Sequence, residues 1–431
     1  MTPWLTREEQ IQVVKTLVGF GLIKFDNNRS LKLKSGGFTD IYINLRDARN
    51  SPAAMKYLSE IFAIALRRLN LDRFIEVPDA VSCFAEYLAI LTNLPYLTIR
   101  ETPKEGRVSD AKVIGKSNKG ESVAIFDDVI TDGASKIIPI RQCLDMELLI
   151  KALIILVDRQ QGWQNKFGVE QISVPVWPGM TLHDVRKILI QDLGVMKRCD
   201  AKTETANPLI VALDGKSWEE ILPMIDQLRT TGCILKVNDL LFAKGIENLL
   251  PDLSVYGRVM ADLKCYDIPN TVANTCKNLR ICPPWAVTVH ASGGKEMIQA
   301  AVKALAGTPT QVLAVTVLTS FDEESCHEIY SRAPLEQTLA LAEIAAKAGA
   351  HGFVCSPQET PYLRKKYPDM TIVNPGIRSA GKETNDQKRV DTPKEAVLAG
   401  AGYLVMGRQI LGAPDPVKEV QRILKEELNI Q

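Results

Sequence analysis

The hydrophobic positions after residue 208 fall into eight short runs, most of them separated by segments with the period of a helix. The runs are Leu209–Leu213, Cys233–Val237, Arg258–Leu263, Ala286–His290, Val312–Val317, His351–Cys355, Met370–Asn374 and Gly402–Met406. Apolar runs of this length that alternate with helical patterns are typical of parallel strands joined by crossover helices. Eight such units in about 220 residues predict a (β/α)8 barrel.

The first half of the chain has a different pattern. An amphipathic helix followed by a short turn is predicted over residues 1–30. Further helices are predicted over 53–69 and 81–92, and strands over 40–44, 95–100, 122–126 and 151–157. This alternation predicts an α/β domain with a mostly parallel sheet.

The sequence between Cys199 and Asn207 is polar and has no hydrophobic period. We place a linker over residues 199–207, between a first domain of residues 1–198 and a second domain of residues 208–431. A chain of 431 residues is long enough for two domains.

Composition narrows the class of protein. A hydrophobic content of 46% and a charged content of 24% are typical of soluble globular proteins. The net charge of +1 gives no reason to expect nucleic acid or an acidic membrane surface as a partner. The longest aliphatic stretches, such as residues 152–157, are far shorter than the roughly 20 residues of a membrane-spanning helix. No signal peptide is visible, so we expect a cytoplasmic protein.

Cysteine and histidine content bears on metal chemistry and redox state. The nine cysteines are scattered without a CxxC pair, and the chain has only four histidines. This pattern favours reduced thiols over a disulfide framework. We expect no protein-bound metal site.

Charged residues gather where the first three predicted barrel strands end. Asp214 follows the first run, Lys236 lies in the second, and Asp262 and Lys264 close the third on one face of an alternating strand. Asp267 follows on the next loop. A lysine held between carboxylates keeps its charge and can donate a proton to a developing carbanion. The carboxylates would also repel a substrate carboxylate and favour its departure as carbon dioxide. An ordinary surface ion pair would explain one such triplet, but five charged strand-end positions favour a site.

The last two predicted strands are each followed by glycine and arginine. The seventh leads into Pro375–Arg378, and the eighth into Gly407 and Arg408. Loops after strands seven and eight of a barrel frequently bind phosphate, and guanidinium groups bind it bidentately. We therefore predict a phosphate site formed by the two arginines.

The segment Ala261–Thr271 resembles the active-site signature of orotidine 5'-phosphate decarboxylases. The similarity continues through residues 211–214, 235–236, 287–294, 314–320, 375–378, 386–387 and 407–408, and it covers residues 208–431. It implies conversion of orotidine 5'-monophosphate to UMP and carbon dioxide without a metal or organic cofactor. It also implies a homodimer or higher homo-oligomer whose ligands are small molecules.

The resemblance assigns roles to individual residues. Lys264 would donate a proton to C6 of the pyrimidine, flanked by Asp262 and by Asp267, whose counterpart in this family reaches in from the partner subunit. The implied substrate-binding residues are Asp214, Lys236, Ile268, Thr271, Thr319, Arg378, Gln387, Gly407 and Arg408. Asp214 and Lys236 would contact the ribose, and Thr319 would contact the pyrimidine. Gln387 and both arginines would bind the phosphate. Lys236 would also belong to the catalytic residues. We interpret His290 as a packed structural histidine.

A second chemical motif lies at residues 126–135. A buried strand is predicted to lead Asp127 and Asp128 into a turn that opens a helix, where the backbone N–H groups of residues 131–135 can hold a phosphate. The two acids suit vicinal ribose hydroxyls, or magnesium carried by a pyrophosphate. A capped helix start with incidental acids is the alternative interpretation.

This motif resembles the PRPP-binding loop of type I phosphoribosyltransferases. Residues 33–37, Tyr42 and the pair Asp158-Arg159 make residues 1–198 similar to orotate phosphoribosyltransferases, which precede the decarboxylase in fused UMP synthases. The resemblance implies transfer from PRPP, with Mg²⁺, to orotate held by Lys34 and Arg159, with Lys104 in a catalytic role. The implied binding residues are Lys34, Tyr42, Arg100, Lys104, Asp127, Asp128, Thr131, Asp132, Gly133, Ala134, Ser135 and Arg159.

Two loops of the first domain depart from the transferase pattern. Glu101 replaces a lysine and Gly106 a histidine, whereas Glu76 stands in place of a glycine and Asp79 adds a further acid. Carboxylates beside a pyrophosphate are electrostatically unfavourable. The alternative prediction is therefore a monofunctional decarboxylase whose first domain is a non-catalytic binding or assembly module.

Overall fold

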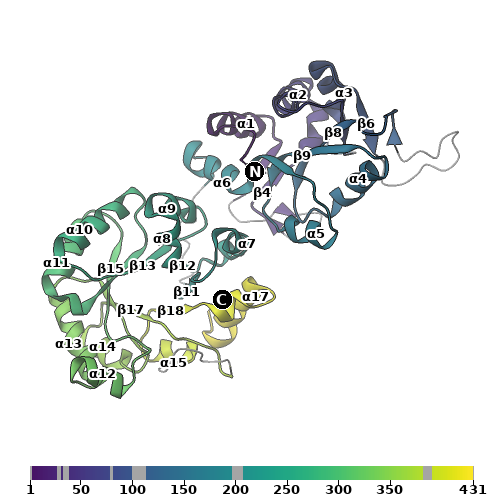
Figure 1. Cartoon of the computed structure of the whole chain (residues 1–431). Helices are drawn as coiled ribbons and strands as arrows, with labels where there is room; N and C mark the ends of the chain where they lie inside the picture. The colour runs from purple at the N-terminus through teal and green to yellow at the C-terminus, as the bar shows by residue number, and fades with distance from the viewer. Residues whose placement is uncertain are drawn as a thin grey trace. The chain divides into compact units, whose positions relative to one another are not determined.

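The computed structural model describes residues 2–26, 31–32, 38–77, 81–99, 113–196, 207–381 and 391–430. The chain divides into two compact units, Met1–Lys197 and Arg198–Gln431 (Figure 1). Residues 199–206 of the predicted linker lie outside the described residues, as do four predicted site residues, namely Lys34, Arg100, Lys104 and Gln387.

The first unit is built on a six-stranded sheet with the strand order β10-β9-β8-β5-β6-β7. The strands are β5 (Arg73–Glu76), β6 (Tyr96–Ile99), β7 (Val113–Ile114), β8 (Ser122–Ile130), β9 (Leu149–Asp158) and β10 (Val176–Thr181). All neighbours pair in parallel except β6 and β7. A mostly parallel sheet is what the alternation of strands and helices predicts.

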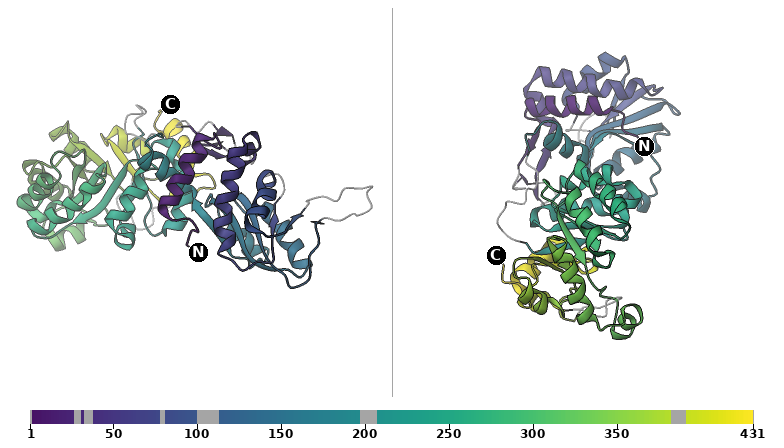
Figure 2. Two further views of the ribbon diagram at one scale, coloured as in Figure 1. Left: turned by 90° about the horizontal axis from the view of Figure 1, so that it is seen from above. Right: turned by 90° about the vertical axis from the view of Figure 1, so that its left-hand side faces the viewer.

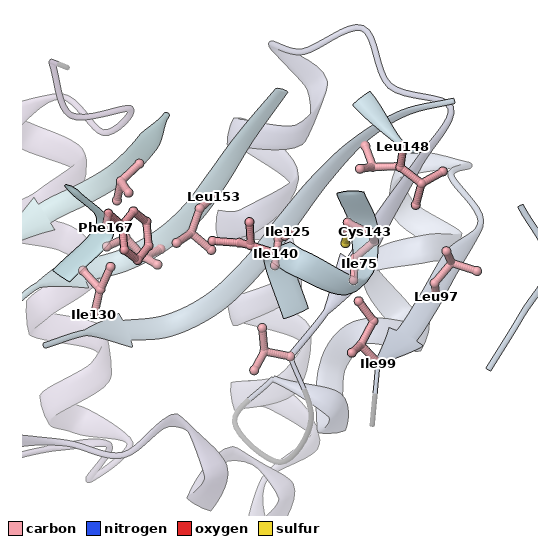
Figure 3. Close-up of a cluster of buried hydrophobic side chains, with 14 residues drawn as sticks. Ile75, Leu97, Ile99, Ile125, Ile130, Ile140, Cys143, Leu148, Leu153 and Phe167 are labelled. Carbon is pink, nitrogen blue, oxygen red and sulfur yellow. The ribbon is translucent and has the colours of Figure 1, made fainter. Parts of the chain in front are cut away.

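Helices cover both faces of this sheet (Figure 1). They are α1 (Arg7–Gly19), α2 (Pro52–Arg67), α3 (Ser82–Thr92), α4 (Ala134–Asp145), α5 (Trp163–Val169) and α6 (Leu182–Lys187). Because strand side chains alternate, Phe74 and Phe126 point to the face that carries Phe62 of α2. Their neighbours Ile75 and Ile125 point the other way, into the cluster with α4 and α5 that Figure 3 shows.

Two small antiparallel pairs accompany the main sheet. They join β1 (Ile23–Phe25) to β4 (Ile41–Ile43) and β2 (Leu31–Lys32) to β3 (Phe38–Thr39). The pairing of β1 corrects the prediction for residues 1–30, because the helix ends at Gly19 and a strand follows it. The strand β10 was also not expected from the sequence, which carries Pro178 in its middle. Proline is tolerated there because β10 is an edge strand.

The second unit is a closed barrel of eight parallel strands in sequence order (Figures 1 and 2). The strands are β11 (Leu209–Ala212), β12 (Ile234–Val237), β13 (Val259–Cys265), β14 (Ala286–His290), β15 (Gln311–Val315), β16 (Gly352–Val354), β17 (Thr371–Asn374) and β18 (Tyr403–Met406). Each lies within or overlaps one of the eight apolar runs, so the predicted barrel is confirmed.

The barrel strands are connected by helices, and some of these begin with a side-chain cap, such as the capping box at Ser217 before α7. The helices are α7 (Trp218–Leu228), α8 (Asp239–Lys244), α9 (Ile246–Ser254), α10 (Pro269–Asn278), α11 (Gly294–Ala304), α12 (Glu323–Tyr330), α13 (Pro334–Lys347), α14 (Thr360–Lys366), α15 (Pro393–Leu398), α16 (Arg408–Leu411) and α17 (Pro416–Arg422). Buried side chains from seven of the eight strands, including Ile210, Met260 and Leu313, pack into one cluster. Within the described ranges, no helix has the length and apolar character needed to cross a membrane.

The aromatic cluster of the first unit predicts where that unit is most sensitive to mutation. Phe126 is fully buried, and its ring centroid lies 5.2 Å from that of Phe74, 5.5 Å from that of Phe62 and 6.1 Å from that of Phe84. We expect Phe126→Ala to lower the free energy of opening of β8 by about 3–5 kcal/mol, because a cavity replaces these contacts. Hydrogen exchange of the β8 amides measures this value. The control Ile90→Ala, at a 76% exposed position, should cost no more than about 0.5 kcal/mol; equal effects of the two variants would contradict the prediction.

Candidate functional site

A cavity of about 870 Å³ lies at the carboxyl ends of the barrel strands, where functional groups of parallel barrels gather. Its charged and polar lining is drawn from most strand ends, and its apolar lining consists largely of strand residues. The polar lining residues include Asp214, Lys236, Asp262, Lys264, Thr319, Arg378 and Arg408, and the apolar ones include Met260, Val315, Val317, Val354 and Val405. The cavity therefore brings together these seven polar residues, all of which the sequence analysis predicts to be site residues.

A chain of alternating charges crosses the ends of β11, β12 and β13. Oδ2 of Asp262 accepts a hydrogen bond from Nζ of Lys264 at 2.7 Å and another from Nζ of Lys236 at 2.9 Å. The Lys236 ammonium also donates to Oδ2 of Asp214 at 2.5 Å. Asp262 and Lys236 are both buried. Two carboxylates and two ammonium groups neutralise one another, which makes the burial of these charges tolerable.

Two polar side chains that sequence analysis did not assign hold Asp262 and Lys264 in place. The Thr288 hydroxyl of β14 donates to Oδ1 of Asp262 at 2.8 Å and accepts the Lys264 backbone N–H at 2.9 Å. The Asn238 side-chain amide donates to the Asp262 carbonyl oxygen at 2.6 Å. The only sequence signal for a role of Thr288 is that it is a hydroxyl residue in the otherwise apolar start of β14, and this signal is weak.

The backbone at Lys264 differs from the predicted regular strand. Its φ is +46°, and the register of β13 against β14 shifts between Ala261 and Cys265. Left-handed φ is uncommon for a residue other than glycine and marks local strain. Asp262 and Lys264 do meet, but simple strand alternation is not the reason. Their contact depends on a bulge that re-aims the Lys264 side chain.

The charged chain determines the protonation states of its members. Burial opposes the charged form of Asp262, but Lys236 and Lys264 outweigh it and lower the pKa of Asp262 to about 2. Burial likewise opposes the charge of Lys236, whereas the carboxylates of Asp262 and Asp214 raise its pKa above the ordinary value. Asp262 is therefore anionic and Lys236 cationic at neutral pH. The stabilisation from Asp262 is complete above its unfolded pKa near 4 and is lost as the pH falls toward about 2.

The predicted phosphate residues lie on another arc of the barrel. Arg378 follows β17 and Arg408 follows β18, and these strands are neighbours. Both arginines and Gly407 line the cavity. The cavity thus has guanidinium groups beside β17 and β18 and the charged chain beside β11 to β13.

Three predicted residues in the loop before α10 and in its first turn are not among those that line the cavity. Asp267 and Ile268 are exposed, and Oδ1 of Asp267 accepts the Ile268 backbone N–H at 2.6 Å. Thr271 lies in the first turn of α10 and is also exposed. The substrate and partner-subunit roles of these residues remain predictions.

The predicted site of the first unit lies at the carboxyl end of β8. Asp127 and Asp128 belong to the strand itself, so the turn begins later than predicted. Asp127 is buried and forms an ion pair with Lys136 of α4. Burial and then Asp127 raise the pKa of Asp128 to about 7, although Lys136 acts in the opposite direction. The acid pair therefore already has a cation from within the chain.

Other predicted groups of the first unit also have internal partners. Oδ1 of Asp132 accepts the Ala134 backbone N–H at 3.1 Å, which occupies one donor predicted for phosphate. The guanidinium of Arg159 donates to the Thr39 hydroxyl at 3.1 Å and to the Ile41 carbonyl at 3.3 Å. Tyr42 lies beside this contact, in β4.

Gly133 precedes α4 with φ +79°, and a Cβ there would lie 2.8 Å from the Phe167 ring.

The second unit is a closed parallel barrel, and its strand ends present a partly buried lysine–aspartate chain and two arginines. This is the arrangement of a barrel enzyme that acts on small ligands. Residues 207–423 match the family described as the orotidine 5'-phosphate decarboxylase / HUMPS family. The chain belongs to this family.

Individual proteins are similar to about half of the chain. Orotidine 5'-phosphate decarboxylase of Nitrosococcus oceani is 41% identical over 227 residues, which cover 52% of this chain and 98% of that protein. A crystal structure of orotidine 5'-phosphate decarboxylase from Lactobacillus acidophilus shares 37% identity, covers 52% of this chain and 99% of that chain, and has a TM-score of 0.45. A structure of Leishmania donovani UMP synthase shares 26% identity, covers 43% of this chain and 39% of that chain, and has a TM-score of 0.37.

His290 provides a test of the electrostatics beside Lys264. Burial and then Lys264 lower the pKa of His290 from its ordinary value of 6.5, and its ring packs edge-on against Tyr266. We expect NMR titration to give a pKa below 6.5, so that stability decreases as the pH falls below the unfolded value. Lys264→Met should raise the pKa of His290, because it removes the nearby positive charge. His351 is the control, because burial is the only cause that lowers its pKa; this pKa should not change in Lys264→Met. A His290 pKa of 6.5 or above, or an equal shift of both histidines, would contradict this account.

Proposed function

We propose that the second unit decarboxylates orotidine 5'-monophosphate to UMP and carbon dioxide, a step of pyrimidine nucleotide biosynthesis. The observation that carries this proposal is the chain of hydrogen bonds from Asp214 through Lys236 and Asp262 to Lys264 inside the barrel cavity. Membership of the decarboxylase family and the similarity to orotidine 5'-phosphate decarboxylases support it. Decarboxylation in this family needs no cofactor.

The proposed mechanism begins with substrate binding at both arcs of the cavity. Arg378 and Arg408 hold the phosphate, as guanidinium groups do well. Asp214 and Lys236 contact the ribose, and Thr319 contacts the pyrimidine. Binding at the phosphate brings the substrate carboxylate toward the charged chain. Binding energy from a remote group can in this way offset an unfavourable interaction at the reacting centre.

The bond-breaking step uses the charges of Asp262 and Lys264. Asp262, with a pKa of about 2, stays anionic and repels the substrate carboxylate. The bond from C6 to the carboxylate carbon breaks, carbon dioxide leaves, and the electron pair remains on C6. The Lys264 ammonium stabilises this developing carbanion and donates its proton to C6. Solvent then returns a proton to Lys264.

Substitution of Lys264 tests this mechanism. Lys264→Ala should lower kcat by on the order of 10³-fold or more, because both the stabilising charge and the proton donor are lost. The variant should remain folded, since Asp262 keeps its hydrogen bonds to Lys236 and Thr288. Release of carbon dioxide from orotidine 5'-monophosphate measures the effect, and circular dichroism checks the fold. Lys303→Ala, at an exposed position of α11, is the matched control. Turnover near the wild-type rate in folded Lys264→Ala would rule out this role.

We further propose that the first unit transfers a phosphoribosyl group from PRPP to orotate, so that its product is the substrate of the barrel. Support comes from the acid pair at the carboxyl end of β8, the tight Gly133 turn and the helix α4 that follows. This arrangement suits a ribose 5-phosphate group, with Mg²⁺ delivered by the pyrophosphate. Lys34, Arg100 and Lys104, which the proposal also needs, lie outside the described residues.

One observation favours a second candidate, a non-catalytic binding or assembly domain on a monofunctional decarboxylase. Lys136 already neutralises Asp127, the acid that would otherwise face the ribose hydroxyls or Mg²⁺. Asp132 likewise occupies the Ala134 N–H. A ligand would have to displace both internal partners, and each displacement costs binding energy.

Orotate consumption by the purified chain distinguishes the two candidates. The transferase proposal predicts that orotate is consumed only when both PRPP and Mg²⁺ are present. Lys136→Met should raise this rate, because it frees the Asp127 carboxylate. Decarboxylation of orotidine 5'-monophosphate by the same preparation is the control for folding. Intact decarboxylation without orotate consumption, in both the wild type and Lys136→Met, would support the non-catalytic domain instead.

A further inference from the structure

The residues that directly follow the two cavity arginines are bonded to each other. Ser379 follows Arg378, and Gln409 follows Arg408. Oε1 of Gln409 accepts the Ser379 backbone N–H at 3.0 Å, and Nε2 of Gln409 donates to the Ser379 hydroxyl at 2.6 Å. A single amide thus contacts one residue at two points, which fixes both distance and orientation between the two loops.

This contact is anchored to the last helical segments of the chain. Nε2 of Gln409 also donates to Oε1 of Glu419 in α17 at 2.8 Å. The Ser379 hydroxyl donates to Oε1 of Glu427 at 2.6 Å and accepts from Nη2 of Arg422 at 3.1 Å. Arg422 is itself paired with Glu419 and Glu427, at 2.8 and 2.9 Å. Ser379 is only 7% exposed, so this network is well protected from water on one side.

The two loops need such a connection because the sheet ends before them. The pairing of β17 with β18 runs through Val373 with Tyr403 and Asn374 with Leu404. The arginines come four residues after each of these last partners, and among the described residues the pairing of β17 with β18 does not extend to them. Gln409 and Ser379 resume the connection immediately beyond the arginines.

We propose that Gln409 is a positioning residue that sets the spacing of the Arg378 and Arg408 guanidinium groups for the phosphate of the substrate. The inference rests on the proposed decarboxylase function, in which both arginines bind that phosphate. Gln409 does not itself contact the phosphate. Its role is to hold the backbone of both loops at a fixed distance. This distance matters because a guanidinium group that is displaced by a fraction of an ångström to one ångström loses much of its binding to a phosphate.

Comparison of nucleotide binding with nucleoside binding distinguishes this positioning role of Gln409 from a general role in stability. Gln409→Ala should lower kcat/KM for orotidine 5'-monophosphate by about tenfold, because misplaced arginines bind the phosphate less well. The dissociation constant of UMP should rise in parallel, whereas that of uridine, which lacks the phosphate, should stay within about twofold. Arg408→Ala gives the reference for a lost phosphate contact. Gln299→Ala, an exposed glutamine of α11, is the matched control and should change nothing.

The same measurements can overturn the proposal. Unchanged UMP binding, or an equal weakening of UMP and uridine binding, would show that Gln409 does not act through the phosphate. If Gln409→Ala does not fold, Gln409→Met decides the matter, because it keeps about the same size without adding a charge and loses both hydrogen bonds to Ser379. The double variant Gln409→Ala with Ser379→Ala should lose less than the sum of the two single losses; fully additive losses would contradict a shared contact. Absence of decarboxylation in the wild-type chain would refute the proposed function, whereas UMP and uridine binding would still decide the role of Gln409.

Discussion

The buried carboxylate of Asp262 is the constraint on which the second unit depends. A carboxylate removed from water costs several kcal/mol unless cations and hydrogen-bond donors surround it. Here Lys236, Lys264 and the Thr288 hydroxyl provide them, at 2.9, 2.7 and 2.8 Å. These partners come from three adjacent strands, so the register of β12, β13 and β14 must be correct before the charge is tolerable. The barrel and the charged chain therefore depend on each other: the strands bring the groups together, and the groups penalise any other register.

The barrel and most of its cavity residues could be predicted from the sequence, because both have strong local signatures. Each strand is a short apolar run, and a charged residue at the end of such a run must face the end of the barrel. The bulge at Lys264 has no comparable signature, since a left-handed φ at lysine arises from tertiary contacts and not from local preference. The same is true of Thr288 and Asn238. These two residues matter because of the hydrogen bonds that they form with Asp262 and Lys264. No simple pattern in a single sequence predicts such contacts.

The first unit shows the same limit in a different form. The mostly parallel character of its sheet follows from alternating strands and helices, but the strands β5, β7 and β10 were not predicted, and Pro178 conceals β10, which is an edge strand. Its acid motif was also visible, but the partner of Asp127 was not. Lys136 lies in the first turn of α4, where a lysine usually faces solvent, yet here it is buried against Asp127. An ion pair of this kind can reverse the interpretation of a motif, because the carboxylate that would bind a ligand is already neutralised within the protein.

The two arcs of the barrel cavity suggest how binding and reaction are separated. The charged chain beside β11 to β13 is internally neutral and partly buried, so it offers little attraction to a carboxylate. Attraction has to come from elsewhere, and the arginines beside β17 and β18 are suited to a dianionic phosphate. Within the described residues, both loops extend beyond the pairing of β17 with β18, and the side chain of Gln409 connects them there. The two-point contact between Gln409 and Ser379 joins these loops, and its partners in α17 and Glu427 connect them to the last helical segments of the second unit. A substrate would then be held firmly at one arc and placed under electrostatic stress at the other, which is how remote binding energy can lower the barrier to a reaction.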